Sequence, residues 1–470
     1  MFSQEVKQKL AAIVGEENID DSKAGRLVYS YDATPNFQSM PDAVVAPRNT
    51  KEVSDIVKIC QQYRVPLVPR GSGTNLCAGT CPTEGGIVLL FKHMNQIIEI
   101  DEENLTVTVQ PGVVTLDMIH AVEKKGLFYP PDPSSMKIST IGGNINENSG
   151  GLRGLKYGVT RDYVLALEVV LPNGDIIRTG GKLAKDVAGY DLTRLFVGSE
   201  GTLGVITEAT LKLIPMPETK KTMLALYQDL EAAARSVSKI IANKIIPTTL
   251  EFLDQPTLQV VEDFAKIGLP TDVQAVLLIE QDGPEEVVTR DMKKMADVCR
   301  SEGAVSVEVA ETEEEANALR TARRSALSAL ARLKPTTILE DATVPRSEIA
   351  AMVQAINQIA IKHQVNICTF GHAGDGNLHP TCLTDARDHE EMKRVEEAFA
   401  EIFARAIELG GTITGEHGVG VMKAPYLEWK LGAEGIQAMK AIKQAFDPDN
   451  IMNPGKVFAK DSRKRVVITK

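Results

Sequence analysis

Short runs of β-forming residues, separated by glycine and proline, fill the chain from residue 41 to about residue 217. Such runs, rich in Val, Ile and Leu and bounded by turn-forming residues, are typical of strands. Helical periodicity appears between them. One stretch places four residues on a single helix face: Val53, Ile56, Val57 and Cys60. This alternation predicts an α+β domain.

The pattern changes at PMPETKK, residues 215–221, whose proline and charge content is typical of a linker. Longer amphipathic helices follow, with strands between them. The predicted helices cover residues 229–244, 284–303 and 313–333, and the predicted strands cover residues 275–283 and 365–374. This region predicts a second α+β domain of roughly 200 residues, which is a usual domain size.

The end of the chain is rich in helix and then in turns, and it includes the run FDPDNIMNPGKVF. A segment this short cannot support its own core, so it must pack on a domain that is already folded. We expect a first domain at residues 1–217, with its core at about 38–217, and a second domain at residues 218–412. A C-terminal segment at residues 413–470 is expected to complete the first domain.

Composition narrows the class of protein. A chain of 470 residues exceeds one ordinary core, so two or three domains are expected. The net charge of -11 argues against a nucleic-acid partner, because phosphates select a basic surface. No apolar run approaches the ~18 residues of a membrane-spanning helix. Six scattered cysteines without a CxxC motif favour a reducing compartment. These features predict a cytoplasmic protein.

Three glycine-dense stretches lie in the first half, at residues 68–75, 130–151 and 197–207. Glycine lets backbone N–H groups approach an anionic ligand closely. Each stretch alone is compatible with a tight turn, and none has a GxGxxG or GxxxxGK[ST] spacing. The middle stretch is predicted to be irregular and is far longer than a connection requires. Together the three suit a long ligand with a pyrophosphate and a flat ring.

The first half resembles the FAD-binding domain of vanillyl-alcohol-oxidase (PCMH) type flavoproteins in PDAVVAPRNTKEVSDIVKIC, VPRGSGTN, PPDPSS, TIGGNINENSGG and GSEGTLGVIT. The second half is similar to the glycolate oxidase catalytic subunit and to D-lactate and D-2-hydroxyglutarate dehydrogenases in ILEDATVP, GHAGDGNLHP, GEHGVG and FDPDNIMNPGK. The resemblance covers nearly the whole chain. It implies an FAD domain, a substrate-binding cap domain and oxidation of a D-2-hydroxy acid.

The same resemblance implies which residues contact FAD. Those expected to cradle the pyrophosphate are Arg70, Gly71, Ser72, Gly73, Thr74 and Asn75. Those expected to follow the cofactor are Pro131, Asp132, Ser134, Thr140, Gly142, Gly143, Asn144, Asn148, Ser149 and Gly150. Those expected at the adenosine and isoalloxazine are Glu200, Gly201, Gly204 and Ile206. Relatives with covalent FAD commonly carry a histidine in the first loop, where this chain has Thr74, so non-covalent FAD is expected.

The run GHAGDGNLH predicts a hairpin, because Asp-Gly is a strong signal for a two-residue turn. With Asp375 and Gly376 as that turn, His372 lies directly opposite His379. Directly opposed residues share a sheet face with Cβ atoms ~5 Å apart. Two imidazoles so placed can bind one cation. The alternative is a polar hairpin in which the two histidines only form hydrogen bonds.

A second run, GEHGVG, adds a carboxylate and a third histidine. Glu416 is the natural third ligand, and a site with three protein ligands keeps open positions for water and substrate. The family resemblance implies that His372, His379 and Glu416 bind a divalent metal, Fe, Zn or Mn. His417 is then expected to act as the general base that takes the substrate hydroxyl proton.

An acid substrate favours arginine, whose planar fork matches a carboxylate. Four arginines precede Glu340 and Asp341: Arg320, Arg323, Arg324 and Arg332. In the family pattern a Trp is followed three residues later by an Arg, and that pattern places Arg323 at the substrate-binding position. The Trp position is Arg320 here, a departure that leaves the size of the substrate open.

We therefore expect a flavin dehydrogenase of D-2-hydroxy acids, with D-lactate as the first choice of substrate and glycolate as the second. The metal is expected to bind the substrate hydroxyl while Arg323 holds the carboxylate and hydride passes to the flavin. The chain has no iron–sulfur cysteine pattern and no dinucleotide fingerprint. A partner is expected to take the electrons: an electron-transfer flavoprotein, an iron–sulfur subunit or a quinone.

Two other classes of protein share part of this pattern. A non-catalytic FAD-binding subunit would keep the glycine-dense stretches but would not need His372, His379, Glu416 and His417. A nicotinamide-linked zinc dehydrogenase would need a GxGxxG turn after a strand, and the chain has none. Both readings therefore explain less of the sequence.

Overall fold

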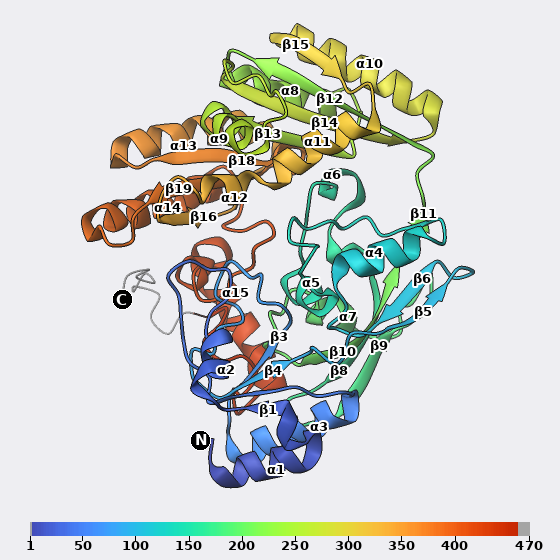
Figure 1. Cartoon of the computed structure of the whole chain (residues 1–470), viewed down its shortest axis with the longest axis vertical. Helices are drawn as coiled ribbons and strands as arrows, with labels where there is room; N and C mark the ends of the chain where they lie inside the picture. The colour runs from blue at the N-terminus through green and yellow to red at the C-terminus, as the bar shows by residue number, and fades with distance from the viewer. Residues whose placement is uncertain (1, 459–470) are drawn as a thin grey trace. The chain divides into compact units, whose positions relative to one another are not determined.

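A computed structural model of the chain describes residues 2–458 (Figure 1). Within that range the chain forms two compact units. The first unit comprises residues 2–149, 159–216 and 416–458, and the second comprises residues 150–158 and 217–415. Of the predicted C-terminal segment, residues 413–470, the part from residue 459 onward lies outside the described residues. No helix among the described residues is long and apolar enough to cross a membrane.

Two sheets and a short strand pair form the first unit. One sheet has the order β1-β2-β4-β3, parallel except at β1, and the other is antiparallel with the order β5-β6-β10-β8-β9. The strands are β1 Ile19–Asp20, β2 Ala43–Val45, β3 Leu67–Arg70, β4 Ile87–Leu90, β5 Ile97–Asp101, β6 Thr106–Val109, β7 Leu127–Phe128, β8 Val164–Val170, β9 Ile176–Gly180, β10 Val205–Lys212 and β11 Ile214–Pro215. The helices are α1 Gln4–Val14, α2 Lys23–Val28, α3 Thr50–Tyr63, α4 Thr115–Glu123, α5 Ile141–Glu147, α7 Leu192–Phe196 and α15 Leu427–Phe446.

Helix α3 shows how the sequence pattern builds this unit. It begins after Asn49, whose side chain accepts a hydrogen bond from the Glu52 N–H at 2.9 Å. The predicted apolar face of α3 is fully buried in one core with strand residues such as Ile87 and Leu89. Burying each such side chain contributes roughly 1.5–3 kcal/mol. The prediction for this helix is confirmed.

Helix α5 corrects the prediction that residues 130–151 are irregular. The helix begins after Thr140, whose hydroxyl accepts from the Gly143 N–H at 3.4 Å, and it ends at Asn148 in the left-handed conformation with φ 54°. Ile141 and Ile145 on its inner face are fully buried. Caps at both ends and this burial outweigh the low helix propensity of two glycines.

An eight-stranded antiparallel sheet forms the second unit, with the order β15-β12-β14-β13-β18-β19-β16 and with β17 paired to β19. Its strands are β12 Thr219–Tyr227, β13 Thr249–Asp254, β14 Ala275–Gly283, β15 Ala304–Val309, β16 Thr336–Leu339, β17 Ala342–Thr343, β18 Ile367–His372 and β19 Asn377–Thr384. Its helices are α6 Gly154–Tyr157, α8 Leu230–Ala242, α9 Gln255–Ala265, α10 Glu285–Ser301, α11 Glu313–Arg324, α12 Ala326–Leu330, α13 Ile349–His363 and α14 His389–Glu408.

Two predicted boundaries in this unit are wrong. Strand β12 begins inside the predicted linker, because Thr219 already pairs with Gly283 of β14. The single helix predicted over residues 313–333 is two helices, α11 and α12, which meet at Ser325. The Ser325 hydroxyl donates to the Ala322 carbonyl at 2.7 Å, a local bond that competes with continuation of a helix.

Candidate functional site

A cavity in the first unit lies where the glycine-dense stretches meet. Its lining includes eight of the residues expected to contact FAD: Arg70, Gly71, Thr140, Gly142, Gly143, Glu200, Gly201 and Ile206. It also includes seven that the sequence did not single out: Pro69, Gly79, Thr80, Phe91, Pro111, Asn146 and Glu147. The three stretches, far apart in the chain, therefore surround one cavity.

Backbone rather than side chains forms much of this lining. A Cβ atom at Gly71 would overlap the Thr140 hydroxyl, and one at Gly142 would lie 2.6 Å from the Pro111 Cβ. No residue larger than glycine fits at either position without a shift of its neighbour. Several N–H groups of the wall are bonded within the protein, such as that of Gly142, which donates to the Pro111 carbonyl at 2.8 Å. Glycine therefore serves here to let the chain segments of the wall pack closely around the cavity.

Two buried donors lie in the first loop, and one of them, on Arg70, belongs to a residue that lines the cavity. The Arg70 Nε and the Asn75 Nδ2 are buried and have no hydrogen-bond partner among the described residues. Burial also lowers the pKa of Arg70. The Asn75 Oδ1 is fixed because it accepts from the N–H groups of Cys77 at 2.8 Å and Gly79 at 2.6 Å. A buried donor without a partner is costly, so Arg70, which lines the cavity, fits the pyrophosphate of FAD.

Several of the expected cofactor residues have structural partners instead. The Asn144 Nδ2 donates to the Thr115 hydroxyl at 2.7 Å, and Asn148 ends helix α5. The Ser72 hydroxyl donates to the Ile138 carbonyl. The expected residues that do not line the cavity are Ser72, Gly73, Thr74, Asn75, Pro131, Asp132, Ser134, Asn144, Asn148, Ser149, Gly150 and Gly204. Of these, Gly150 belongs to the second unit.

In the second unit, His372 and His379 lie on neighbouring strands of the sheet, β18 and β19. Their rings are 5.1 Å apart between centroids, and both side chains are buried. The predicted register is wrong, because His372 pairs with Asn377 and His379 pairs with Phe370. The two histidines are diagonal neighbours on one sheet face rather than directly opposed, and they are still close enough to share an ion.

The longer turn explains the register. The predicted two-residue turn is a four-residue connection, made by the 3₁₀ turn Ala373–Asp375 and by Gly376 in the left-handed conformation with φ 78°. The Val344 N–H donates to the Gly376 carbonyl at 3.0 Å, and a Cβ at Gly376 would overlap the Val344 carbonyl. This close approach of the neighbouring backbone selects the longer turn over the local Asp-Gly preference.

Glu251 on β13 is a site residue that the sequence did not reveal. Its carboxylate is fully buried, with Oε1 2.7 Å from the His372 Nδ1 and Oε2 2.5 Å from the Arg323 guanidinium. Burial alone would raise the pKa of Glu251, but Arg323 and His372 lower it overall. The Glu251 carboxylate accepts from the His372 Nδ1–H and thereby fixes the tautomer and the orientation of the ring. It stands alone in its stretch of sequence, so no motif marks it.

The predicted arginines separate into different roles. Arg323 is 3% exposed, and its guanidinium stacks 4.8 Å from the Phe370 ring centroid, beside the histidines. Arg320, at the family's Trp position, forms ion pairs with Glu280 and Glu313 at 2.5 Å each. Arg332 lies over the Phe264 ring. Of these three, only Arg323 lies beside the histidine pair.

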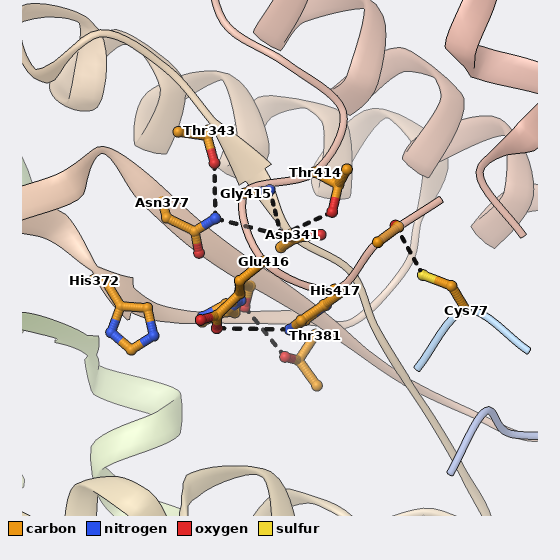
Figure 2. Close-up of polar contacts among 12 residues, drawn as sticks. Cys77, Asp341, Thr343, His372, Asn377, Thr381, Thr414, Gly415, Glu416 and His417 are labelled. Atoms are coloured by element: carbon orange, nitrogen blue, oxygen red, sulfur yellow. Dashed lines mark hydrogen bonds and ion pairs between the residues drawn. The ribbon is translucent and has the colours of Figure 1, made fainter. Parts of the chain in front are cut away.

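Glu416 follows a segment that the second unit holds firmly. The Gly415 N–H and the Thr414 hydroxyl both donate to Asp341 Oδ2, at 2.5 and 3.2 Å (Figure 2). Glu416 is the residue after Gly415. One ligand atom from each of His372, His379 and Glu416 lies within 4.8 Å of the other two. Two imidazoles and a carboxylate suit Zn, Mn or Fe, so the donor set fits a divalent metal.

His417, the expected base, is the next residue. Its Nε2 lies 3.9 Å from the Glu416 Oε1, and its side chain is largely buried (Figure 2). At this distance the imidazole is beside the carboxylate without a hydrogen bond to it. The chain therefore carries one histidine immediately next to the candidate metal ligands.

Comparisons with known proteins cover both units. The model of the C-terminal domain of FAD-linked oxidases matches residues 216–457, and a FAD binding domain model matches residues 41–180. The glycolate oxidase subunit GlcD of Bacillus subtilis is 78% identical over 99% of both chains. The subunit of the same name from Escherichia coli K12 is 38% identical over 91% of this chain and 86% of its own. D-lactate dehydrogenase of Anaerostipes hadrus is 37% identical over 97% and 96%.

Solved structures agree on the fold. p-Cresol methylhydroxylase aligns with a TM-score of 0.81 at 20% identity, over 97% of this chain and 96% of that one. 4-Ethylphenol oxidase of Gulosibacter chungangensis aligns with a TM-score of 0.79 at 19% identity, over 97% of both chains. The α+β fold is thus that of vanillyl-alcohol-oxidase type flavoproteins. With the family matches and the 78% identical relative, these findings show that the chain belongs to the FAD-linked oxidases.

Proposed function

We propose that the protein oxidises a short 2-hydroxy acid to the 2-oxo acid with FAD as the hydride acceptor, and that glycolate is the preferred substrate. The observation that carries the proposal is the buried cluster of His372, His379 and Arg323 around Glu251. A hydroxy acid requires a cation that binds its carboxylate and, beside it, side chains that can hold a metal for its hydroxyl group. Arg323 and the two histidines are groups of these kinds. The relatives named glycolate oxidase subunit and D-lactate dehydrogenase support the same substrate class.

The order of substrates differs from the sequence-based expectation, which placed D-lactate first. The 78% identical relative is named a glycolate oxidase subunit, whereas the relative named D-lactate dehydrogenase is 37% identical. We therefore place glycolate first and D-lactate second. The two acids differ by one methyl group, which a pocket discriminates by only about 1–3 kcal/mol.

Each group of site residues has a separate role in the proposed reaction. FAD would be held in the cavity of the first unit and would supply the hydride acceptor. Its attachment would be non-covalent, because Thr74 stands where relatives with covalent FAD commonly carry a histidine. A divalent metal on His372, His379 and Glu416 supplies a Lewis acid that lowers the hydroxyl pKa. Arg323 orients the substrate carboxylate with the part of its guanidinium that Glu251 does not take. His417 accepts the hydroxyl proton.

We further propose that the electrons leave through a partner, either an iron–sulfur subunit or an electron-transfer flavoprotein. The word "subunit" in the names of two relatives supports a partner protein. The chain's six cysteines are buried free thiols scattered through both units, so they provide no cluster-binding motif. A test mixes the reduced enzyme with each class of acceptor and follows the return of the flavin absorbance.

The function is tested by adding substrates to the purified flavin-loaded chain without air. Glycolate, D-lactate, L-lactate and D-2-hydroxyglutarate are compared by the rate at which each bleaches the flavin absorbance. We expect glycolate to bleach it fastest and D-lactate to follow. If no acid bleaches the flavin, the chain is a non-catalytic FAD-binding subunit and the proposal fails.

The metal is tested in the same assay. Dialysis against a chelator should remove bleaching, and a divalent metal should restore it. A matched control is His363→Ala, because His363 contacts Glu401 on α14, at 2.8 Å, rather than the site. Bleaching that survives both chelation and His379→Ala would remove the metal from the proposal and leave the dehydrogenase.

A further inference from the structure

A pair of carboxyl groups lies in the cavity of the first unit, and the proposed reaction does not use it. Glu147 ends helix α5, Glu200 belongs to the loop before β10, and both line the cavity. A Cβ at Gly418 would touch the Glu147 Oε2 and would lie 3.2 Å from the Glu200 Oε1. The two carboxyl groups therefore face the same small space.

The loop that carries Glu200 is built to present this side chain. Glu200 adopts the left-handed conformation at φ 53°, which is strained for a residue other than glycine. The strain is held by the end of α5, where the Asn146 carbonyl accepts from the Glu200 N–H at 2.9 Å and its Oδ1 accepts from the Gly201 N–H at 3.0 Å. Helix α5 and this loop thus form one rigid wall.

Their hydrogen bonds differentiate the two acids. Glu200 accepts from the backbone N–H groups of Val419 and Gly420, at 2.7 Å each. Burial is the largest effect and raises the pKa of Glu200, while the two N–H donors act in the opposite direction and favour the charged form. The Glu147 Oε2 is buried and has no hydrogen-bond partner among the described residues. Glu200 is therefore the better place for a negative charge.

One charge in such a space disfavours a second. Burial, and then the charge of Glu200, raise the pKa of Glu147 well above its usual range, while Asn75 and Lys423 act in the opposite direction. A neutral carboxylic acid carries a proton that it can donate. A buried polar atom left without a partner is costly, so an oxygen that lines a cofactor cavity without one is expected to find it on the cofactor.

We propose that Glu147 is a protonated carboxyl group that donates a hydrogen bond to an acceptor atom of the bound FAD. Glu200 is then the charged member of the pair and orders the loop at Gly418–Gly420. This inference depends on FAD alone and requires neither a particular substrate nor the metal. A failure here therefore leaves the proposed function standing, and a failure of the substrate test leaves this inference standing.

The test compares two variants of the flavin-loaded protein. Glu147→Gln keeps a neutral polar group with an N–H donor. We therefore expect the FAD affinity to stay within about threefold of the wild-type value, and the flavin reduction potential to stay near its wild-type value. Glu147→Ala removes the donor, so we expect about tenfold weaker FAD binding, the equivalent of one hydrogen bond. Glu208→Gln on β10, whose carboxylate lies 3.5 Å from Arg178, is the matched control.

Two results would overturn the inference. A Glu147→Ala protein that binds FAD as tightly as wild type would show that no bond to the cofactor exists. A marked rise in the flavin reduction potential in Glu147→Gln would show that the native side chain is charged, because removing a negative charge favours the reduced flavin. Infrared difference spectra upon flavin reduction decide the matter if the Ala variant does not fold. They should contain a protonated-carboxyl band that Glu147→Gln lacks.

Discussion

The two units build their sites from different materials. In the first unit the cavity wall is largely backbone, supplied by stretches in which glycine lets neighbouring chains approach, as at Gly71 and Gly142. In the second unit the site is a set of charged and imidazole side chains on strands and a helix, and Glu251 joins two of them. A backbone site tolerates many changes outside its glycines, whereas a network of buried charges loses function when one member is removed.

The largest expected effect separates chemistry from cofactor binding. His379→Ala removes one of the three candidate metal ligands, and a Lewis acid contributes several kcal/mol to such a reaction. We expect flavin bleaching by glycolate to slow by on the order of 10³-fold, since each tenfold is about 1.4 kcal/mol. The FAD content should stay at the wild-type level, because the residues that line the cavity all belong to the first unit. A variant that also loses FAD would contradict the division of labour between the units.

The next effect concerns stability of the second unit. Arg320 lies in a buried ion pair with Glu280, and truncating one member leaves an uncompensated charge. Arg320→Ala should therefore destabilise the second unit by about 3–5 kcal/mol. Hydrogen exchange of peptides from β12 and β14 measures this loss. Arg332→Ala, which removes only a contact with Phe264, is the control and should leave exchange nearly unchanged.

Arg70→Ala tests the first unit in turn. It removes a buried cation whose Nε lacks a protein partner, so the expected loss is that of a charged hydrogen bond, about 1.5–3 kcal/mol. FAD affinity should fall by about 10- to 100-fold, as measured from flavin fluorescence. Arg48→Ala, at an exposed ion pair with Glu17, should bind FAD normally. Equal affinities for the two variants would mean that Arg70 does not contact the cofactor.

Glu251→Gln sharpens the account of the second unit. The amide keeps the size of the side chain but loses the charge between His372 and Arg323. Changes to such supporting groups typically cost 10- to 100-fold in metal affinity or activity. Calorimetric titration of the apoprotein with zinc measures the metal affinity. The KM for glycolate reports on the position of Arg323. Unchanged metal affinity and unchanged KM together would show that Glu251 serves stability alone.

The smallest effect is expected at the cap of α3. Asn49→Ala removes the hydrogen bond to the Glu52 N–H and should cost the first unit about 1 kcal/mol. The single tryptophan, Trp429, lies in the first unit, so its fluorescence during urea unfolding reports this change. Hydrogen exchange in the second unit should not respond. If it does, the two units unfold together.

The sequence predicted elements whose signal is local. The buried face of α3 and strand β14 over Ala275–Gly283 were predicted correctly, because apolar periodicity and flanking turn residues mark them directly. The register of the hairpin was predicted wrongly. The Asp-Gly signal describes an isolated turn, whereas Val344 of a neighbouring segment selects the longer connection. Local propensity lost to a backbone contact from elsewhere in the fold.

Sequence alone determined that glycine-dense loops, two hairpin histidines and the Glu416-His417 pair belong to one kind of protein, because each motif is short and continuous. Only the tertiary structure decided which residues surround them. Glu251 lies more than one hundred residues from His372 in the chain, and the sheet makes them neighbours. Glu147 is likewise brought beside Glu200 and Gly418 by the fold. Burial and charge pairing are properties of the folded surroundings, and those surroundings are absent from any single stretch of sequence.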